Sequence, residues 1–389
     1  MYDEQFTPKS GAINQKRNIE FFHHNALASW GGKEQQDSFA VLHPKDEYKD
    51  NQTGLYVVLH SAGHDLYSCL GCTFHEGNHD IYRTPDDLFG LYLDCRANED
   101  EDFWWGGINA KNEGKAERKD TIQPVEKRIY ATIEWVIRNY NIDENRVYLV
   151  GNSMGGSGAL GLGMCRGDLF AAIKVNVPAG VEHMIDRCFN SNLEIVDPPV
   201  CIDYSAKNDS WSDGHEKLYK AARENHFALY GYWANFGHAN VDKVMLEQND
   251  LIHSVNWLKI RKNCAYPVMT QCDADKPNPW ENPEFSNEPG FVNAFFAWEN
   301  KIDTCDCFEI ILKKASKEEL KTSFDVPNTI TGNISLRRLQ EFIVAPNEKI
   351  CWAFGEKSGV ATADNKGLLT IENLTITSEG ETLQLTRNK

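Results

Sequence analysis

The chain has 389 residues, a length that usually corresponds to about two to three domains. Its composition, 41% hydrophobic and 25% charged, is that of a folded globular protein rather than a disordered one. The net charge of −17 argues against nucleic-acid binding, which needs a positive field, and no apolar run reaches the roughly 18–20 residues that span a membrane.

Strand-like apolar runs alternate with helical patterns through the first 265 residues. Two short runs, at residues 19–22 and 38–42, are expected to be lead-in strands that join the sheet. The later runs lie at residues 55–59, 88–93, 147–150, 171–177, 200–204 and 227–233. This alternation predicts an α/β fold, with a mostly parallel sheet flanked by helices.

The clearest predicted helix begins at Pro124, which suits the first helical position because its missing N–H has no partner there. The basic residues Lys127, Arg128 and Arg138 lie off its apolar stripe. The stripe follows the 3.6-residue period, at Val125, Ile129, Ile133, Val136, Ile137 and Tyr140.

The pattern changes near residue 265. Residues 266–288 are rich in Pro, Asn and Asp, which indicates a linker between an α/β domain (1–265) and a second domain (289–389). In the second domain, short strand-like pieces separated by turn residues predict a small β-sandwich. These pieces lie at residues 295–298, 308–312, 340–344, 350–354, 368–371 and 382–385.

A G-x-S-x-G pattern occupies residues 151–155, directly after the apolar run at 147–150 and before a helical stretch of small residues. A glycine-rich turn can be purely structural. Between a strand and a helix, however, this pattern places a serine in a strained turn, where bulky neighbours at the glycine positions would clash. This context predicts Ser153 as a catalytic nucleophile.

A serine nucleophile needs a base that is itself oriented by an acid. With this motif the expected chain order is Ser, then Asp or Glu, then His. Asp209 follows the strand-like run at 200–204 and is the predicted acid, whereas Asp203 lies inside that run. Asp213 is the main alternative, although it also suits the N-cap of the next helix.

The predicted base is His238, on a loop after the last strand-like run of the α/β domain. A loop at that position can bring an imidazole over the nucleophile, although a surface histidine is the plain alternative. His215 and His226 are rivals, but they lie on or beside the preceding helix.

An oxyanion hole needs two backbone N–H donors. One is expected from Met154, the residue after the nucleophile, and the other from the loop after the buried run at 55–59. Ser61 or Ala62 can supply the donor from this loop, which we call the first donor, and we choose Ala62 because small residues let the backbone approach the oxyanion. His60 is expected to brace this loop rather than to catalyse.

Two adjacent tryptophans, Trp104 and Trp105, follow the run at 88–93 and an acidic stretch. Loops after parallel strands gather at the active-site end of a sheet. The pair predicts either buried packing or a stacking wall for a sugar ring or an aromatic acyl group. Trp211, close behind Asp209, could join such a wall.

Together these motifs resemble the α/β-hydrolase superfamily, on residues 59–63, 146–156 and 237–238 with Asp209. The nearest groups are the secreted carbohydrate esterases, which include feruloyl and acetyl-xylan esterases and polyester depolymerases, and the prolyl-oligopeptidase-like serine hydrolases. Residues 140–148 are especially similar to those esterases. The resemblance covers about residues 20–260 and departs at Ser61, where glycine is commoner, so the first N–H donor stays open.

The resemblance and the residues imply a serine esterase that works through an acyl-enzyme, with acyl or feruloyl groups on polysaccharide as the substrate. One alternative is a peptidase of the prolyl-oligopeptidase-like type, which the short leading segment disfavours because it cannot form a propeller. The other is a catalytically inert, hydrolase-like protein that binds carbohydrate.

No metal or organic cofactor is expected. Cys69, Cys72, His75 and His79 are ligand types for zinc, but the usual spacing puts about 12 residues between the two pairs. The resemblance implies a secreted or periplasmic protein. The start of the chain lacks the basic and apolar parts of a signal peptide, and the 11 cysteines are odd in number, so a cytoplasmic location stays open. The oligomeric state is not predicted.

Overall fold

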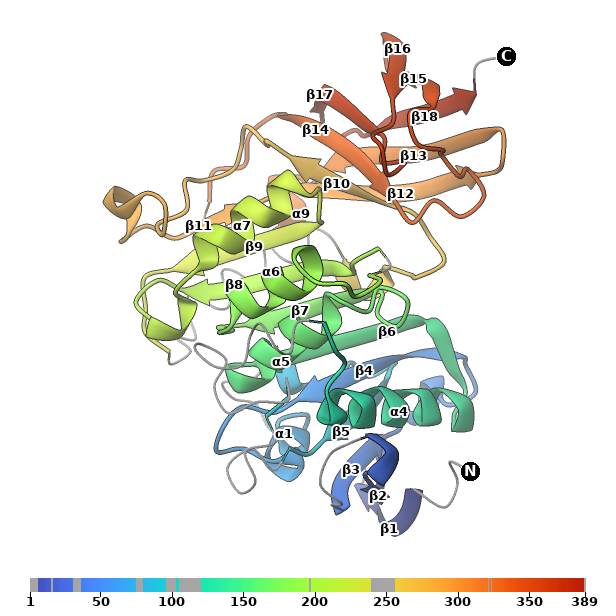
Figure 1. Cartoon of the computed structure of the whole chain (residues 1–389), viewed down its shortest axis with the longest axis vertical. Helices are drawn as coiled ribbons and strands as arrows, with labels where there is room; N and C mark the ends of the chain where they lie inside the picture. Colours follow the sequence, from blue (N-terminus) through green and yellow to red (C-terminus); the bar gives the residue numbers. More distant parts are fainter. Residues whose placement is uncertain are drawn as a thin grey trace. The chain divides into compact units, whose positions relative to one another are not determined.

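The computed structural model describes residues 6–14, 17–30, 36–74, 80–95, 103–104, 120–195, 197–238, 256–320, 322 and 324–387 (Figure 1). The chain forms two compact units. Unit 1 comprises Met1–Leu218 and Phe236–Ala239, and unit 2 comprises Tyr219–Asn235 and Asn240–Lys389. The domain boundaries expected around residue 265 stay a prediction.

Unit 1 is built on a mixed sheet with the strand order β1-β2-β3-β5-β4-β6-β7-β8. The pairs between β5 and β8 are parallel, whereas β1, β2 and β3 join antiparallel as the expected lead-in strands. The strands are β1 (Phe6–Asn14), β2 (Arg17–Asn25), β3 (Gln36–Leu42), β4 (Thr53–Leu59), β5 (Phe89–Leu93), β6 (Ile142–Asn152), β7 (Ala172–Asn176) and β8 (Val200–Ala206). Because parallel strands point the same way, the loops after β4, β6 and β8 leave the sheet at one edge.

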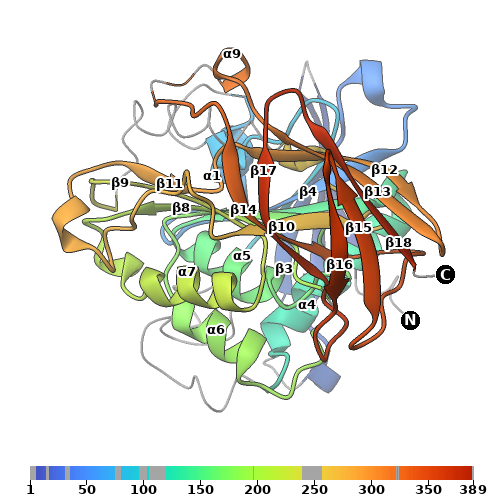
Figure 2. The same cartoon turned by 90° about the horizontal axis from the view of Figure 1, so that it is seen from above.

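Helices cover both faces of this sheet. The helices α4 (Pro124–Asn139), α5 (Met154–Gly163) and α6 (Val181–Phe189) lie on one face, and α1 (Leu66–Gly71) lies on the other (Figure 2). Covering both faces explains why every residue of β4, β5 and β8 is buried. The predicted α/β-hydrolase fold is confirmed by this sheet and by the strand–turn–helix unit of β6 and α5.

The helix α4 begins at Pro124, as predicted, and buries Val125, Ile129, Ile133 and Val136. Arg128 lies off the apolar stripe but is also buried. Its Nη1 atom lies 3.1 Å from a carboxylate oxygen of Asp37 on β3 and donates to the backbone oxygen of Asp94. Ion pairing therefore brings a second face of the helix into the core, which the apolar period alone does not show.

Unit 2 is rich in strands, as predicted for the C-terminal region. It has two antiparallel sheets, with the strand orders β10-β14-β17 and β12-β13-β18-β15-β16, and an antiparallel pair of β9 with β11. The elements are β9 (Leu229–Ala234), β10 (Tyr266–Thr270), β11 (Gly290–Val292), β12 (Phe296–Asp303), β13 (Cys307–Lys314), α9 (Lys317–Leu320), β14 (Ile330–Arg337), β15 (Lys349–Phe354), β16 (Lys357–Thr362), β17 (Thr370–Ile376) and β18 (Glu381–Arg387). The helix α7 (His215–Glu224) begins in unit 1 and ends in unit 2.

Strands β1, β14 and β16 had not been predicted, and two predicted segments differ from the sequence expectations. Strand β10 lies at the start of the segment predicted as a linker and pairs with β14. The strand predicted at residues 340–344 is wrong, because this segment is a loop. The carboxylate of Asp303 accepts the backbone N–H groups of Gln340, Glu341 and Phe342, which satisfies donors that a strand would offer to a neighbour.

None of the helices in the described part of the chain is long and apolar enough to cross a membrane.

Candidate active site

Ser153 lies in a sharp turn between β6 and α5. Its backbone has φ 55° and ψ −119°, a conformation that L-residues rarely adopt. The turn is held by a hydrogen bond of 2.9 Å from the N–H of Ser153 to the backbone oxygen of Asn176, at the end of β7. A Cβ atom at Gly151 would lie 2.1 Å from the oxygen of Gly155, and one at Gly155 would lie 2.0 Å from the oxygen of Leu59. The glycines of the motif are therefore required for close backbone packing.

The structure brings Ser153, His238 and Asp209 together in unit 1. The Oγ atom of Ser153 lies 2.6 Å from Nε2 of His238, and Nδ1 of His238 lies 2.7 Å from Oδ2 of Asp209. The side chain of His238 is 40% exposed, whereas that of Asp209 is 2% exposed. The nucleophile and the imidazole are thus open to a ligand, while the carboxylate is shielded from water.

The backbone around Asp209 holds its second oxygen in place. Asp209 follows β8 and precedes a short 3-10 helix, η5 (Ser210–Ser212). Its Oδ1 accepts the backbone N–H of Trp211 at 2.9 Å, which leaves Oδ2 directed at His238. Asp213, the alternative acid, is exposed at the end of η5.

The remaining rivals for the acid and the base belong to other networks. Asp203 and His215 are both fully buried, and their side chains meet through Ser205. His226 lies in unit 2, where its Nδ1 atom is 2.7 Å from Oγ of Ser335.

The loop after β4 contains the two candidates for the first oxyanion donor. The N–H of Ser61 donates to Oη of Tyr82 at 3.1 Å, and the hydroxyls of Ser61 and Tyr82 are also hydrogen-bonded. This commitment of Ser61 favours Ala62, which is exposed, as the residue whose N–H can meet a ligand. The second donor is the N–H of Met154, the first residue of α5. At this position the helix itself offers no carbonyl one turn earlier to accept the N–H.

His60 and Trp104 brace this loop from inside the protein. Nδ1 of His60 donates to the oxygen of Ser61 at 2.9 Å, and Nε2 accepts the N–H of Cys95 at 3.0 Å. Trp104 is fully buried, and its indole N–H donates to the backbone oxygen of His60. Trp104 therefore corresponds to the packing alternative and does not form an exposed stacking wall.

The other two tryptophans differ in what the structure shows. Trp105 lies outside the described residues. Trp211 is 41% exposed, and its backbone N–H holds the carboxylate of Asp209. An exposed aromatic side chain therefore lies two residues from the triad acid.

The described residues include no group of three or more His, Cys, Asp or Glu side chains arranged to hold a metal ion. His75 and His79, which follow Cys69 and Cys72 in the sequence, lie outside the described part of the chain.

Two site residues had not been found from the sequence. Tyr82, in the 3-10 helix η4 (Asp80–Tyr82), anchors Ser61, and Asn176 anchors the N–H of Ser153. Neither belongs to a motif. Only the position of Asn176 at the end of a strand next to β6 could have pointed to it.

No protein-family model and no curated protein match the chain. Solved structures that are similar to it include an S-formylglutathione hydrolase from Agrobacterium tumefaciens, with 13% identity and a TM-score of 0.44 over 64% of this chain and 97% of that chain. An acetyl xylan esterase from Aspergillus awamori has 14% identity and a TM-score of 0.39, over 54% of this chain and 93% of that chain. A ferulic acid esterase has 12% identity and a TM-score of 0.41, over 57% of this chain and 91% of that chain. Scores of this size carry no weight for the activity of this chain, which we infer from the site geometry.

Proposed function

We propose that the protein is a serine esterase that hydrolyses carboxylic esters through a covalent acyl-enzyme. The observation that carries this proposal is the continuous hydrogen-bonded chain from Ser153 through His238 to Asp209, with Ser153 in a strained turn at the start of α5. A hydroxyl within 2.6 Å of an imidazole nitrogen can lose its proton to that nitrogen as it attacks.

In the first half of the reaction, Oγ of Ser153 attacks the ester carbonyl and its proton moves to Nε2 of His238. The buried carboxylate of Asp209 holds Nδ1–H of the imidazole and stabilises the imidazolium that forms. When the tetrahedral intermediate collapses, the bond to the alcohol breaks and His238 returns the proton to the leaving oxygen. Water then repeats the sequence and releases the acid.

The oxyanion of the tetrahedral intermediate would be held by the N–H groups of Met154 and Ala62. The N-terminal end of α5 adds the positive end of the helix dipole at this point. Preorganised donors of this kind lower the barrier because they need no rearrangement as charge develops. The bracing of the Ser61 loop by Tyr82 and His60 serves this preorganisation.

For the substrate, we propose acyl or feruloyl groups carried on a polysaccharide. The support is the exposed Trp211, two residues from the triad acid, whose ring can pack on a flat acyl group or on a sugar ring, and the resemblance of the motifs to carbohydrate esterases. A screen of acetylated and feruloylated polysaccharides, with a peptide anilide as the comparison, identifies the preferred class. Preference for the anilide would contradict the esterase assignment.

The activity is tested with p-nitrophenyl acetate and the Ser153→Ala variant. We expect the wild-type chain to hydrolyse the ester and the variant to lose activity by about 10⁶-fold, as in other serine triads. The matched control is Ser210→Ala, which removes a serine hydroxyl near the triad acid but outside the triad. An active Ser153→Ala variant would show that Ser153 is not the nucleophile.

A further inference from the structure

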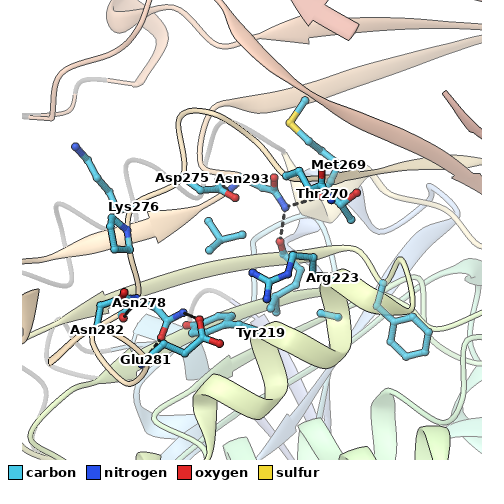
Figure 3. A pocket seen from close by; sticks show the side chains of 16 residues that line it. Tyr219, Arg223, Met269, Thr270, Asp275, Lys276, Asn278, Glu281, Asn282 and Asn293 are labelled. Atoms are coloured by element: carbon cyan, nitrogen blue, oxygen red, sulfur yellow. Dashed lines mark hydrogen bonds between the residues drawn. The ribbon is translucent and has the colours of Figure 1, made fainter. Parts of the chain in front are cut away.

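Unit 2 contains a cavity of about 300 Å³ that the proposed esterase does not use (Figure 3). It is lined by residues from α7, from the ends of β10 and β11, and from the loop that follows β10. Its volume is at the low end of the roughly 300–1,000 Å³ typical of small-molecule sites, so a ligand no larger than one sugar ring fits.

One wall of the cavity has a buried hydrogen-bond acceptor with no partner. Asn293, at the end of β11, is 6% exposed, and its amide nitrogen donates to the backbone oxygens of Leu229 at 2.9 Å and Met269 at 3.1 Å. Because both amide hydrogens are used, the orientation of the amide is fixed, and its Oδ1 atom is buried without a hydrogen bond. An unmet acceptor is costly, and a ligand hydroxyl would satisfy it.

A carboxyl group lies next to this amide. Oδ1 of Asp275 accepts the backbone N–H of Asn293 at 2.7 Å (Figure 3). Burial raises the pKa of Asp275 to about 7, and the negative charge of Asp273 acts in the same direction, while the N–H of Asn293, the thiol of Cys272 and Arg223 oppose the rise. Near neutral pH this carboxyl is therefore present in part as the neutral acid, which can both donate and accept hydrogen bonds.

The charges around the cavity disfavour an ionic ligand. Arg223 and Lys276 line it together with Asp275 and Glu281. An anion would meet carboxylates and a cation would meet basic groups, whereas a neutral molecule avoids both penalties.

The rest of the lining is mixed and includes the polar side chains of Thr270, Gln271 and Asn278 and the apolar side chains of Ala222, Leu229 and Val292. A sugar ring combines hydroxyl groups with C–H faces, so its hydroxyls can bind the polar groups of the lining while its C–H faces pack against the apolar side chains.

We propose that this cavity binds a single neutral sugar ring, whose hydroxyl groups pair with Asn293 Oδ1 and the carboxyl of Asp275. The inference goes beyond the proposed esterase, because every lining residue belongs to unit 2 and none belongs to the triad. The site is thus a second, non-catalytic place at which the chain recognises carbohydrate.

To test this, the full-length chain is titrated with D-xylose, D-glucose and D-galactose. Binding is measured by isothermal titration calorimetry and by ligand-observed NMR. Acetate, ethylammonium and glycine serve as anionic, cationic and zwitterionic comparisons. We expect saturable binding of at least one sugar in the millimolar range, which is usual for a single small ligand, and weaker binding of all three charged probes.

Two pairs of variants locate the binding. Asp275→Ala removes the carboxyl from the cavity, and its control, Glu284→Ala, removes an exposed carboxylate that follows β10 but does not line the cavity. Val292→Phe fills the cavity, and its control, Val360→Phe, places the same ring on an exposed position of β16. We expect Asp275→Ala to weaken sugar binding by at least about tenfold, Val292→Phe to abolish it, and both controls to leave it unchanged.

Three results would overturn the proposal: no saturable binding of any of the sugars, stronger binding of a charged probe, or sugar binding that survives both cavity variants. Failure of this proposal is separable from failure of the esterase. Ser153→Ala should lose ester hydrolysis and keep sugar binding, whereas Asp275→Ala should lose sugar binding and keep hydrolysis of p-nitrophenyl acetate.

Discussion

At the scale of single residues, the carboxylate of Asp209 connects the chemistry of the site to its backbone. One oxygen accepts the N–H of Trp211 and the other meets Nδ1 of His238. With Nδ1 kept as a donor, Nε2 of the neutral imidazole is free to accept a proton from Ser153. A carboxylate is needed here because an amide could present its N–H to the ring and select the wrong tautomer.

We therefore expect Asp209→Asn to lower kcat/KM for p-nitrophenyl acetate by about 10⁴-fold, the loss that this change causes in serine-protease triads. Asp213→Asn is the matched control, four residues away on the same loop and exposed, and should keep wild-type activity. Steady-state kinetics on the two variants decides between the acids. A large loss in Asp213→Asn with an active Asp209→Asn would reverse the assignment.

The positions of Ser153, Asp209 and His238 could be predicted because each follows a recognisable strand in the order that the motif requires. The residues that hold the neighbouring loop in place could not be predicted. Tyr82 reaches Ser61 across 21 residues of sequence, and Trp104 reaches His60 across 44. Such contacts depend on the tertiary packing, so the sequence left open whether Trp104 would line the site or fill the core.

At the scale of elements, a buried polar cluster joins β8 to the start of α7. Nδ1 of His215 lies 2.6 Å from the backbone oxygen of Ser212, its Nε2 atom lies 2.6 Å from Oγ of Ser205, and Ser205 donates to the carboxylate of Asp203. With a carbonyl at one ring nitrogen and a hydroxyl committed to Asp203 at the other, both nitrogens donate. The geometry therefore indicates a charged imidazole.

The pKa of His215 follows from these contacts. Burial lowers it, but the charge and hydrogen bonding of Asp203 and the carbonyl of Ser212 outweigh burial, so the pKa of His215 is raised above its ordinary value of 6.5. A pKa raised by folding gives stability that is complete below 6.5 and is lost as the pH rises through the folded value. The segment between β8 and α7, which carries Asp209, is therefore held most firmly at mildly acidic pH.

We expect the unfolding midpoint in urea to fall as the pH is raised above 6.5, and this fall to flatten in His215→Gln and in Asp203→Asn. Both variants will be less stable overall, so the quantity to compare is the slope of the urea unfolding midpoint against pH. An unchanged slope in both variants would contradict a charged pair in this cluster.

Local periodicity predicted the elements themselves better than their polar partners. The stripe of α4 was correct at Val125, Ile129, Ile133 and Val136, which are buried, whereas Ile137 and Tyr140 are half-buried. Burial of Arg128 depends on Asp37, which lies far earlier in the sequence. The segment at residues 340–344 has apolar residues like a strand, but Asp303 takes its backbone donors. Neither competing interaction has a sequence signature.

At the scale of the whole molecule, the chain leaves unit 1 after Leu218 and returns at Phe236, between the triad acid and the triad base. The segment between these two points, Tyr219–Asn235, is stabilised within unit 2. Strand β9 pairs with β11, Arg337 donates to the backbone oxygens of His226 at 2.6 Å and Asn225 at 2.8 Å, and Asn293 donates to that of Leu229. Residues beyond 265 thus satisfy backbone groups of the segment that leads to His238.

We expect a chain that ends at residue 265 to unfold at a markedly lower temperature than the full chain, or to lack a cooperative transition. It loses the strand partner of β9 and the hydrogen bonds of Arg337, each worth about 1.5–3 kcal/mol when one partner is charged. Thermal melts followed by circular dichroism measure this, with Arg337→Ala in the full chain expected to lie in between. A truncated chain as stable as the full one would show that the C-terminal region is dispensable.

Stoichiometric labelling with diisopropyl fluorophosphate decides whether Ser153 is the nucleophile of an esterase. We expect one covalent adduct per chain by intact mass, located on Ser153 by peptide mapping, with ester hydrolysis falling in proportion to the labelled fraction and no adduct on Ser153→Ala. An adduct on another residue that accompanies the loss of hydrolysis, or full hydrolysis by a completely labelled chain, would contradict this role of Ser153.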